Sequence, residues 1–153
     1  MKSLKPLASW WGIVLLLLVP ASACAQSDPP RAPLATFDYD AEASLDIREV
    51  KREDRGSYTV VDLTCASPAG GRVPALLYEP KGEGPFAGLI LMHGMPGSRK
   101  NSAFLAKPYV EAGAVVLAIT APFARPDDVP RRSTITFTEK DRTEQIQLIQ
   151  DLR

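Results

Sequence analysis

The segment His93–Gly97, which reads His-Gly-Met-Pro-Gly, has the residue types and spacing that best fit chemistry. It directly follows the apolar run Ala87–Met92, and open α/β sheets bind ligands beyond the carboxyl ends of their strands. Glycines let the backbone approach a ligand closely, and Pro96 stiffens the turn although it lacks an N–H. The N–H of Met95 would then point in a fixed direction, which acyl transfer requires of a donor to a developing oxyanion.

Two simpler interpretations of this segment stay open. It can be a plain connection from a strand to a helix, with His93 bonded to nearby backbone. It can also be a phosphate-binding loop, although it lacks the G-x-x-x-x-G-K-[ST] spacing and Pro96 removes one of the amides that such a loop needs. Ser98 is the only serine near the segment that follows a glycine, but no glycine stands two residues later, as a nucleophile elbow would require.

A β-hairpin is expected before this segment. Tyr58–Cys65 and Val73–Glu79 both alternate between apolar and polar residues, and a turn-forming cluster separates them. Pro74 cannot donate a hydrogen bond to a neighbouring strand, which predicts that its strand lies at the edge of the sheet.

The segment itself is expected to lie within a parallel βαβ unit. Ala87–Met92 and Ala114–Ile119 are almost uninterruptedly apolar, as strands covered on both faces are. Ser102–Ala112 can supply the crossover helix, closed by a glycine at its end. Because Pro108 is unfavourable in a helix interior, the helix is expected to start late, near Lys107.

The last part of the chain predicts a loop and a second helix. Ala121–Arg132 contains three prolines and two aspartates, which favour a surface loop. Thr138 and Asp141 have the spacing of an N-terminal capping arrangement. The residues that recur on one helical face after them are Ile146, Ile149 and Leu152.

The N-terminus has the features of an export signal. Two lysines precede the ten-residue apolar run Trp10–Val19, and small residues follow it. Residues 1–23 are therefore predicted to be a signal peptide, residues 24–55 a linker and charged lead-in, and residues 56–153 the folded part. Cys24 stands where a bacterial lipoprotein carries its lipid, so the protein is expected to be periplasmic, secreted or lipid-anchored.

Charge and composition exclude several classes of site. Without Lys2 and Lys5 the chain has 16 basic and 18 acidic residues, and this charge balance does not indicate a nucleic-acid-binding protein. The single histidine, His93, leaves no cluster of metal ligands, and no cofactor is indicated. Cys65 is the only cysteine besides Cys24, and in an apolar strand it is expected to fill the core.

The element order over residues 58–153 resembles that of the α/β-hydrolase superfamily. In this family the loop after the third strand carries an HGG- or HGxPG-type sequence and supplies one N–H of the oxyanion hole. The resemblance implies that Met95 is this donor. The residues that would shape the loop are His93, Gly94, Pro96 and Gly97. The hairpin and the sequence at 76–80 are most similar to the dienelactone-hydrolase and prolyl-oligopeptidase-like branches.

The resemblance also implies a nucleophile, an acid and a catalytic histidine, all after the fourth strand. His93 precedes that point, so it is not expected to be the general base. We expect the triad after Arg153 and the chain to be truncated before the nucleophile strand. The expected fold class is α/β, with an α/β-hydrolase-type sheet made of an N-terminal antiparallel hairpin and a parallel βαβ unit.

The expected function is that of a serine hydrolase acting on a small acyl substrate, an ester, thioester or small amide. The alternative is a non-catalytic, hydrolase-like binding module, since a fold can be kept when its triad is lost. The chain by itself is expected to be inactive toward activated esters. It is also expected to be poorly soluble, because its last parallel strand would leave an open apolar edge.

Overall fold

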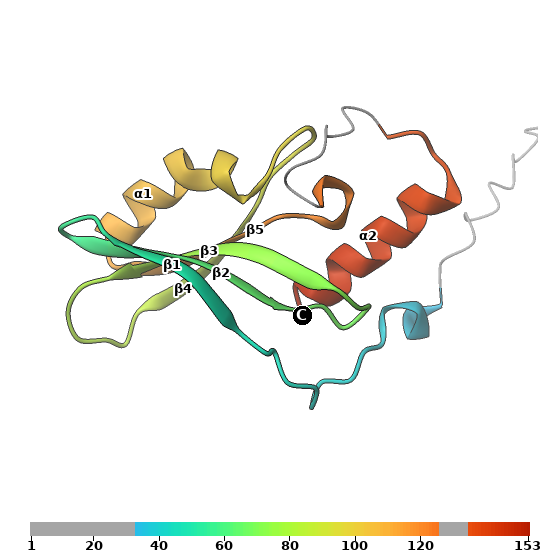
Figure 1. Ribbon diagram of the computed structural model, residues 1–153, viewed down its shortest axis with the longest axis horizontal. Helices are drawn as coiled ribbons and strands as arrows, with labels where there is room; N and C mark the ends of the chain where they lie inside the picture. The colour runs from blue at the N-terminus through green and yellow to red at the C-terminus, as the bar shows by residue number, and fades with distance from the viewer. Residues whose placement is uncertain (1–32, 126–134) are drawn as a thin grey trace, which may run out of the picture. The chain divides into compact units, whose positions relative to one another are not determined.

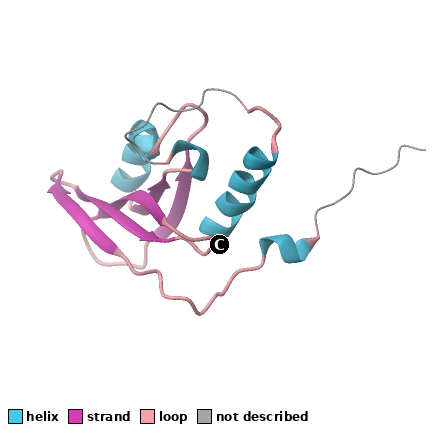
Figure 2. Ribbon diagram, turned by 45° about the vertical axis from the view of Figure 1, so that its right-hand side comes forward, coloured by secondary structure: helices cyan, strands magenta, loops and turns pink. Residues whose placement is uncertain are grey.

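The structure, a computed structural model, describes residues 33–125 and 135–153. Its centre is a five-stranded mixed sheet in the order β1-β2-β3-β5-β4 (Figures 1 and 2). The strands are β1 (Arg48–Asp54), β2 (Tyr58–Ala66), β3 (Arg72–Pro80), β4 (Ala87–Met92) and β5 (Ala114–Ile119). The helices are η1 (Leu34–Phe37), η2 (Arg99–Ser102), α1 (Ala103–Glu111), η3 (Pro122–Ala124) and α2 (Glu139–Asp151).

The predicted hairpin is confirmed: β2 and β3 pair antiparallel from Tyr58 opposite Pro80 to Ala66 opposite Arg72. The edge position predicted from Pro74 is wrong, because β3 lies between β2 and β5. Pro74 stands just beyond the last pair that β3 forms with β5, and its carbonyl accepts the N–H of Thr120 at 2.8 Å. The Pro74 nitrogen, which has no hydrogen to donate, therefore lies outside the β3–β5 hydrogen-bonding ladder, where no donor is needed.

The predicted βαβ unit is also confirmed, since β4 and β5 pair in parallel across η2 and α1. The helix does not start near Lys107, however. It begins at Ala103 and contains Pro108 in its interior. The proline removes the hydrogen bond to the carbonyl of Phe104, and Phe104 is 75% exposed, so water can reach that carbonyl. Gly113 follows the helix with a φ of 91°, a conformation that favours glycine.

Strand β4 is less covered than its apolar sequence predicts. It lies at the edge of the sheet and pairs only with β5 among the described residues. Ile90 is 52% exposed and Met92 is 49% exposed. The prediction that both faces of an apolar strand are buried is therefore wrong for β4 and holds only for β5. The open edge was expected at the last parallel strand, Ala114–Ile119, and this is wrong, because that strand is β5 and lies between β3 and β4.

Strand β1 is an element that the sequence does not predict. It lies within the charged lead-in, and its seven residues are almost all polar. It pairs antiparallel with β2, and its side chains form exposed ion pairs. Arg52, for example, contacts Glu49 and Glu79 at 2.8 Å. The sheet thus starts before residue 56.

The helices cover opposite faces of the sheet because side chains alternate along its strands. Leu148 of α2 packs on one face, with a cluster made up of Val61, Leu63, Val73, Ala75, Ile119 and Ala121. Ala106 and Val110 of α1 pack on the other face, against Tyr78, Val116 and Ala118. In Figure 2 the strands of the sheet are magenta and the helices that pack against it are cyan.

The start of α2 is as predicted, because the Asp141 carboxylate accepts the N–H of Thr138 at 3.1 Å. The predicted apolar face is only partly right. Leu148 is the buried apolar residue of this helix, at 3% exposure, whereas Ile149 is 42% exposed. Residue 148 lies between the positions of the predicted stripe, and it packs against the core under α2.

The signal peptide, its cleavage site and Cys24 lie outside the described residues. Within residues 33–125 and 135–153, no helix has the length and apolar character needed to cross a membrane.

Candidate active-site loop

The predicted loop leaves the carboxyl end of β4, and the ring of His93 fixes its course. His93 is only 5% exposed. Its Nδ1 lies 2.8 Å from the carbonyl oxygen of Gly94, and its Nε2 accepts the N–H of Ala121 at 3.0 Å. The ring of Phe123 packs edge-on against the imidazole, with centroids 5.6 Å apart. His93 therefore ties the loop to the segment that follows β5.

This geometry assigns a structural role to His93. An Nε2 that accepts a hydrogen bond carries no proton, so the proton of the neutral ring lies on Nδ1 and points at the Gly94 carbonyl. Both ring nitrogens are thus engaged with backbone, which leaves neither of them to take a proton from a substrate or a nucleophile.

The segment after β5 is a buried support and not the surface loop predicted for Ala121–Arg132. Thr120 and Ala121 have no exposed surface, and η3 buries Pro122 and Ala124. Pro122, one of the three prolines that suggested a loop, begins a short helix, and Ala121 supplies the N–H that His93 accepts. Residues 126–132 of that prediction lie outside the described part of the chain.

Gly97 closes the loop through a contact that permits no side chain. A Cβ at this position would lie 2.5 Å from the Gly94 carbonyl oxygen and 2.6 Å from Nδ1 of His93. Both neighbours are held in place, since one is backbone and the other is the buried ring. Gly94 is different, because a Cβ there would meet no atom within 4 Å.

We expect Gly97→Ala to destabilise the protein by about 1–3 kcal/mol, the usual cost of forcing an extra methyl into a closely packed place. Urea unfolding followed by circular dichroism measures the change. Gly94→Ala is the matched control and should stay within about 0.5 kcal/mol of the wild type. Equal stabilities of the two variants would contradict the close packing around Gly97.

Met95 has a backbone N–H without a hydrogen-bond partner among the described residues. The residue lines a hollow of about 330 Å³ beside β4 and α1. The other lining residues are Met92, His93, Gly94, Pro96, Gly97, Asn101, Ser102, Phe104 and Leu105. A backbone donor at the rim of a hollow can bind an oxygen atom of a small molecule.

Ser98 and Arg99 anchor the far end of the loop, and the sequence does not predict this. Ser98 is 1% exposed and its N–H donates to the side chain of Asn101 at 2.8 Å, so it begins η2 and is no exposed nucleophile. The Arg99 guanidinium lies 3.2 Å from both carboxylate oxygens of Asp62 on β2. The N–H of Arg99 also donates to the hydroxyl of Thr120 at 3.2 Å.

A buried ion pair holds the support segment against α2. The Arg125 guanidinium donates to the Thr120 carbonyl at 2.8 Å and to the Asp151 carboxylate at 2.7 Å. The Asp151 side chain has no exposed surface, and its second oxygen accepts the hydroxyl of Ser67 at 2.6 Å. These contacts link the end of α2 to the turn between β2 and β3 and to the segment under His93.

Cys65 lies on β2 among the apolar residues under α2, in keeping with a core position. Burial, and next the negative charge of Asp151, raise the pKa of its thiol above the ordinary value. In a Cys24→Ser background we expect a thiol reagent at pH 7.5 to react with Cys65 roughly tenfold more slowly than with glutathione, because the nucleophilic thiolate is scarce and shielded. A rate equal to that of glutathione would contradict this.

No group of three or more potential metal ligands occurs within the described ranges. No protein-family model matches the chain, and no curated protein sequence matches it.

Solved structures show which fold the chain has. Acetyl xylan esterase 1 from Thermoanaerobacterium sp. JW/SL YS485 matches 76% of the chain at 19% identity, with a TM-score of 0.51. An acetyl xylan esterase from Paenibacillus sp. R4 matches 70% of it at 19% identity, with a TM-score of 0.47. The chain spans 39% of the length of the first and 42% of the second. The predicted α/β-hydrolase-type sheet is therefore confirmed.

Proposed function

We propose that this chain is the oxyanion-loop portion of an exported serine hydrolase that acts on an ester, thioester or small amide. The observation that carries the proposal is the N–H of Met95. It is unpaired within the described part of the chain, borders a hollow beyond β4, and sits in a loop fixed by His93 and Gly97. A donor held in advance stabilises an oxyanion without reorganisation during the reaction.

In the proposed mechanism an activated serine attacks the acyl carbon and gives its proton to the base, and the alcohol, thiol or amine takes that proton and leaves as the acyl-enzyme forms. Water then attacks the acyl-enzyme, which releases the acid and restores the serine hydroxyl. The Met95 N–H would stabilise the oxyanion of each tetrahedral intermediate. The nucleophile, its base and its acid would come from parts of the protein that this chain does not include. His93 would not be the base, because both of its ring nitrogens bind backbone.

Esters come first among the substrates to be tested. A solved structure with the same type of fold is named an acetyl xylan esterase, and acetyl is a small acyl group with which to begin. A sequence identity of 19% supports a shared fold and nothing more. The acyl group and the alcohol of the natural substrate are therefore left to experiment.

The test compares two proteins, the 153-residue chain and the full-length gene product, in the hydrolysis of 4-nitrophenyl acetate. We expect turnover by the full-length product, loss of that turnover after treatment with a serine-directed fluorophosphonate, and none by the chain alone. A full-length product that folds but neither turns over esters nor reacts with the fluorophosphonate would contradict the proposal and favour the binding-module alternative.

Export is part of the same proposal and has its own test. Mass spectrometry of the mature N-terminus distinguishes a lipidated Cys24 from a free terminus at Gln26. An uncleaved Met1 terminus in the native host would contradict export.

A further inference from the structure

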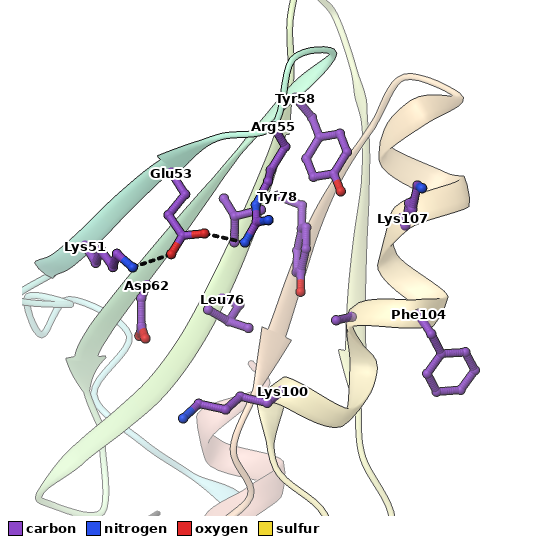
Figure 3. A pocket seen from close by; sticks show the side chains of 12 residues that line it. Lys51, Glu53, Arg55, Tyr58, Asp62, Leu76, Tyr78, Lys100, Phe104 and Lys107 are labelled. Carbon is purple, nitrogen blue, oxygen red and sulfur yellow. Dashed lines mark hydrogen bonds and ion pairs between the residues drawn. The ribbon is translucent and has the colours of Figure 1, made fainter.

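A second pocket lies on the face of the sheet that α1 covers, apart from the hollow at Met95. It has a volume of about 570 Å³, within the range of small-molecule sites, and strands β1 to β3, η2 and α1 contribute to it (Figure 3). Among the residues that the structure describes, only Phe104 lines both pockets. The floor of this second pocket is apolar and is formed by Val60, Leu76 and the ring of Tyr78.

The strongest sign of a ligand is the hydroxyl of Tyr78. The residue as a whole is only 3% exposed, and its hydroxyl makes no hydrogen bond to the residues that the structure describes. The hydroxyl oxygen is not among the fully buried polar atoms, so it opens onto the pocket and is available to donate to a ligand. Figure 3 shows the hydroxyls of Tyr58 and Tyr78 pointing the same way along the pocket, and their ring centroids are 6.3 Å apart. Burial raises the pKa of Tyr78, so its phenol keeps its proton and can donate.

The charges around the pocket favour an anion. Of the described residues, four basic and two acidic ones line it, and both acidic residues already form ion pairs. Glu53 forms ion pairs with Lys51 and Arg55, as the dashed lines in Figure 3 show, and Asp62 binds Arg99 through both oxygens. The side chain of Lys100 extends along the pocket, and its ammonium group forms no ion pair or hydrogen bond within the described ranges. The available polar groups are therefore a cation and phenol donors.

We propose that this pocket binds a small aromatic carboxylate, with the carboxylate between Lys100 and the tyrosine hydroxyls and the ring on the apolar floor. A carboxylate accepts hydrogen bonds from both donor types, and a flat ring suits the surface of Leu76 and Tyr78. The site is independent of ester hydrolysis, because it needs neither Met95 nor a nucleophile.

The test titrates the full-length protein with 2-naphthoate, using calorimetry for affinity and ¹H–¹⁵N spectra for location. We expect saturable binding, with shifts in β2, β3 and α1, and much weaker binding of the neutral 2-naphthamide. Tyr78→Phe removes only the hydroxyl and should weaken binding about tenfold. Lys100→Gln should weaken it about threefold, as expected for a partly exposed ion pair.

Lys140→Gln is the matched control, because it makes the same charge change on α2 at the opposite face and should leave the affinity unchanged. If Tyr78→Phe does not fold, Tyr58→Phe tests the neighbouring hydroxyl. The proposal is overturned by an absence of saturation, by equal affinity for the amide, by unchanged affinity in the Tyr78 and Lys100 variants, or by shifts confined to the hollow at Met95.

Discussion

Replacing the backbone N–H of Met95 by an ester oxygen is expected to lower kcat of the full-length protein for 4-nitrophenyl acetate by about 100- to 1000-fold. The methionine α-hydroxy acid introduces this change and leaves the side chain intact. The loss should appear in kcat, because the oxyanion develops only on the way to the tetrahedral intermediate. No hydrogen bond inside the described part of the chain is broken, since the Met95 N–H makes none there.

The same backbone change at Gly82 serves as the control. Gly82 lies in the exposed loop after β3, and its N–H makes no hydrogen bond within the described residues. We expect unchanged kcat for this variant. If the Met95 variant also keeps the kcat of the wild type, the oxyanion role of Met95 is wrong even if the protein is an esterase.

Asp151→Ala is expected to destabilise the chain by about 3–5 kcal/mol. The substitution leaves Arg125 with a buried charge that has lost its carboxylate, and it leaves the Ser67 hydroxyl without its acceptor. Equilibrium unfolding in urea measures the loss. Because Arg125 also binds the Thr120 carbonyl, we expect the segment under His93 to loosen, which hydrogen exchange at Ala121 would detect.

Two further variants distinguish the stability contributed by the buried ion pair from that contributed by an exposed one. Glu139→Ala breaks an exposed pair with Arg142 on the same helix and should cost less than about 1 kcal/mol. The double variant Arg125→Met, Asp151→Leu removes both charges and should recover part of the stability lost in Asp151→Ala. A cost for Asp151→Ala as small as that for Glu139→Ala would show that the pair is not buried in solution.

The sequence predicts the elements whose pattern depends on local periodicity. The alternation in β2 and β3, the apolar runs of β4 and β5 and the capping residues of α2 all appear where expected. Strand β1 has no such pattern, because an edge strand whose side chains face water on both sides needs no apolar residues. The cover of β4 was overestimated because an apolar strand sequence does not reveal its neighbours in space.

The loop His93–Gly97 could be found from its residue types and its place after β4, but the contacts that hold it could not. Ala121 and Phe123 are far from His93 in sequence, and only the order of β4 and β5 in the sheet brings them together. Arg99 and Asp62 are 37 positions apart and resemble ordinary surface charges in the sequence. A buried partner for a charged residue is a property of the tertiary fold.

The most direct test of the oxyanion role is a crystal structure of the full-length protein after reaction with an alkyl fluorophosphonate. The phosphonate on the serine imitates the tetrahedral intermediate. We predict its oxygen about 2.7–3.1 Å from the Met95 nitrogen, with the His93 ring still bonded to Ala121. An adduct whose oxygen is held by other donors, with the Met95 N–H turned away from it, would contradict the account.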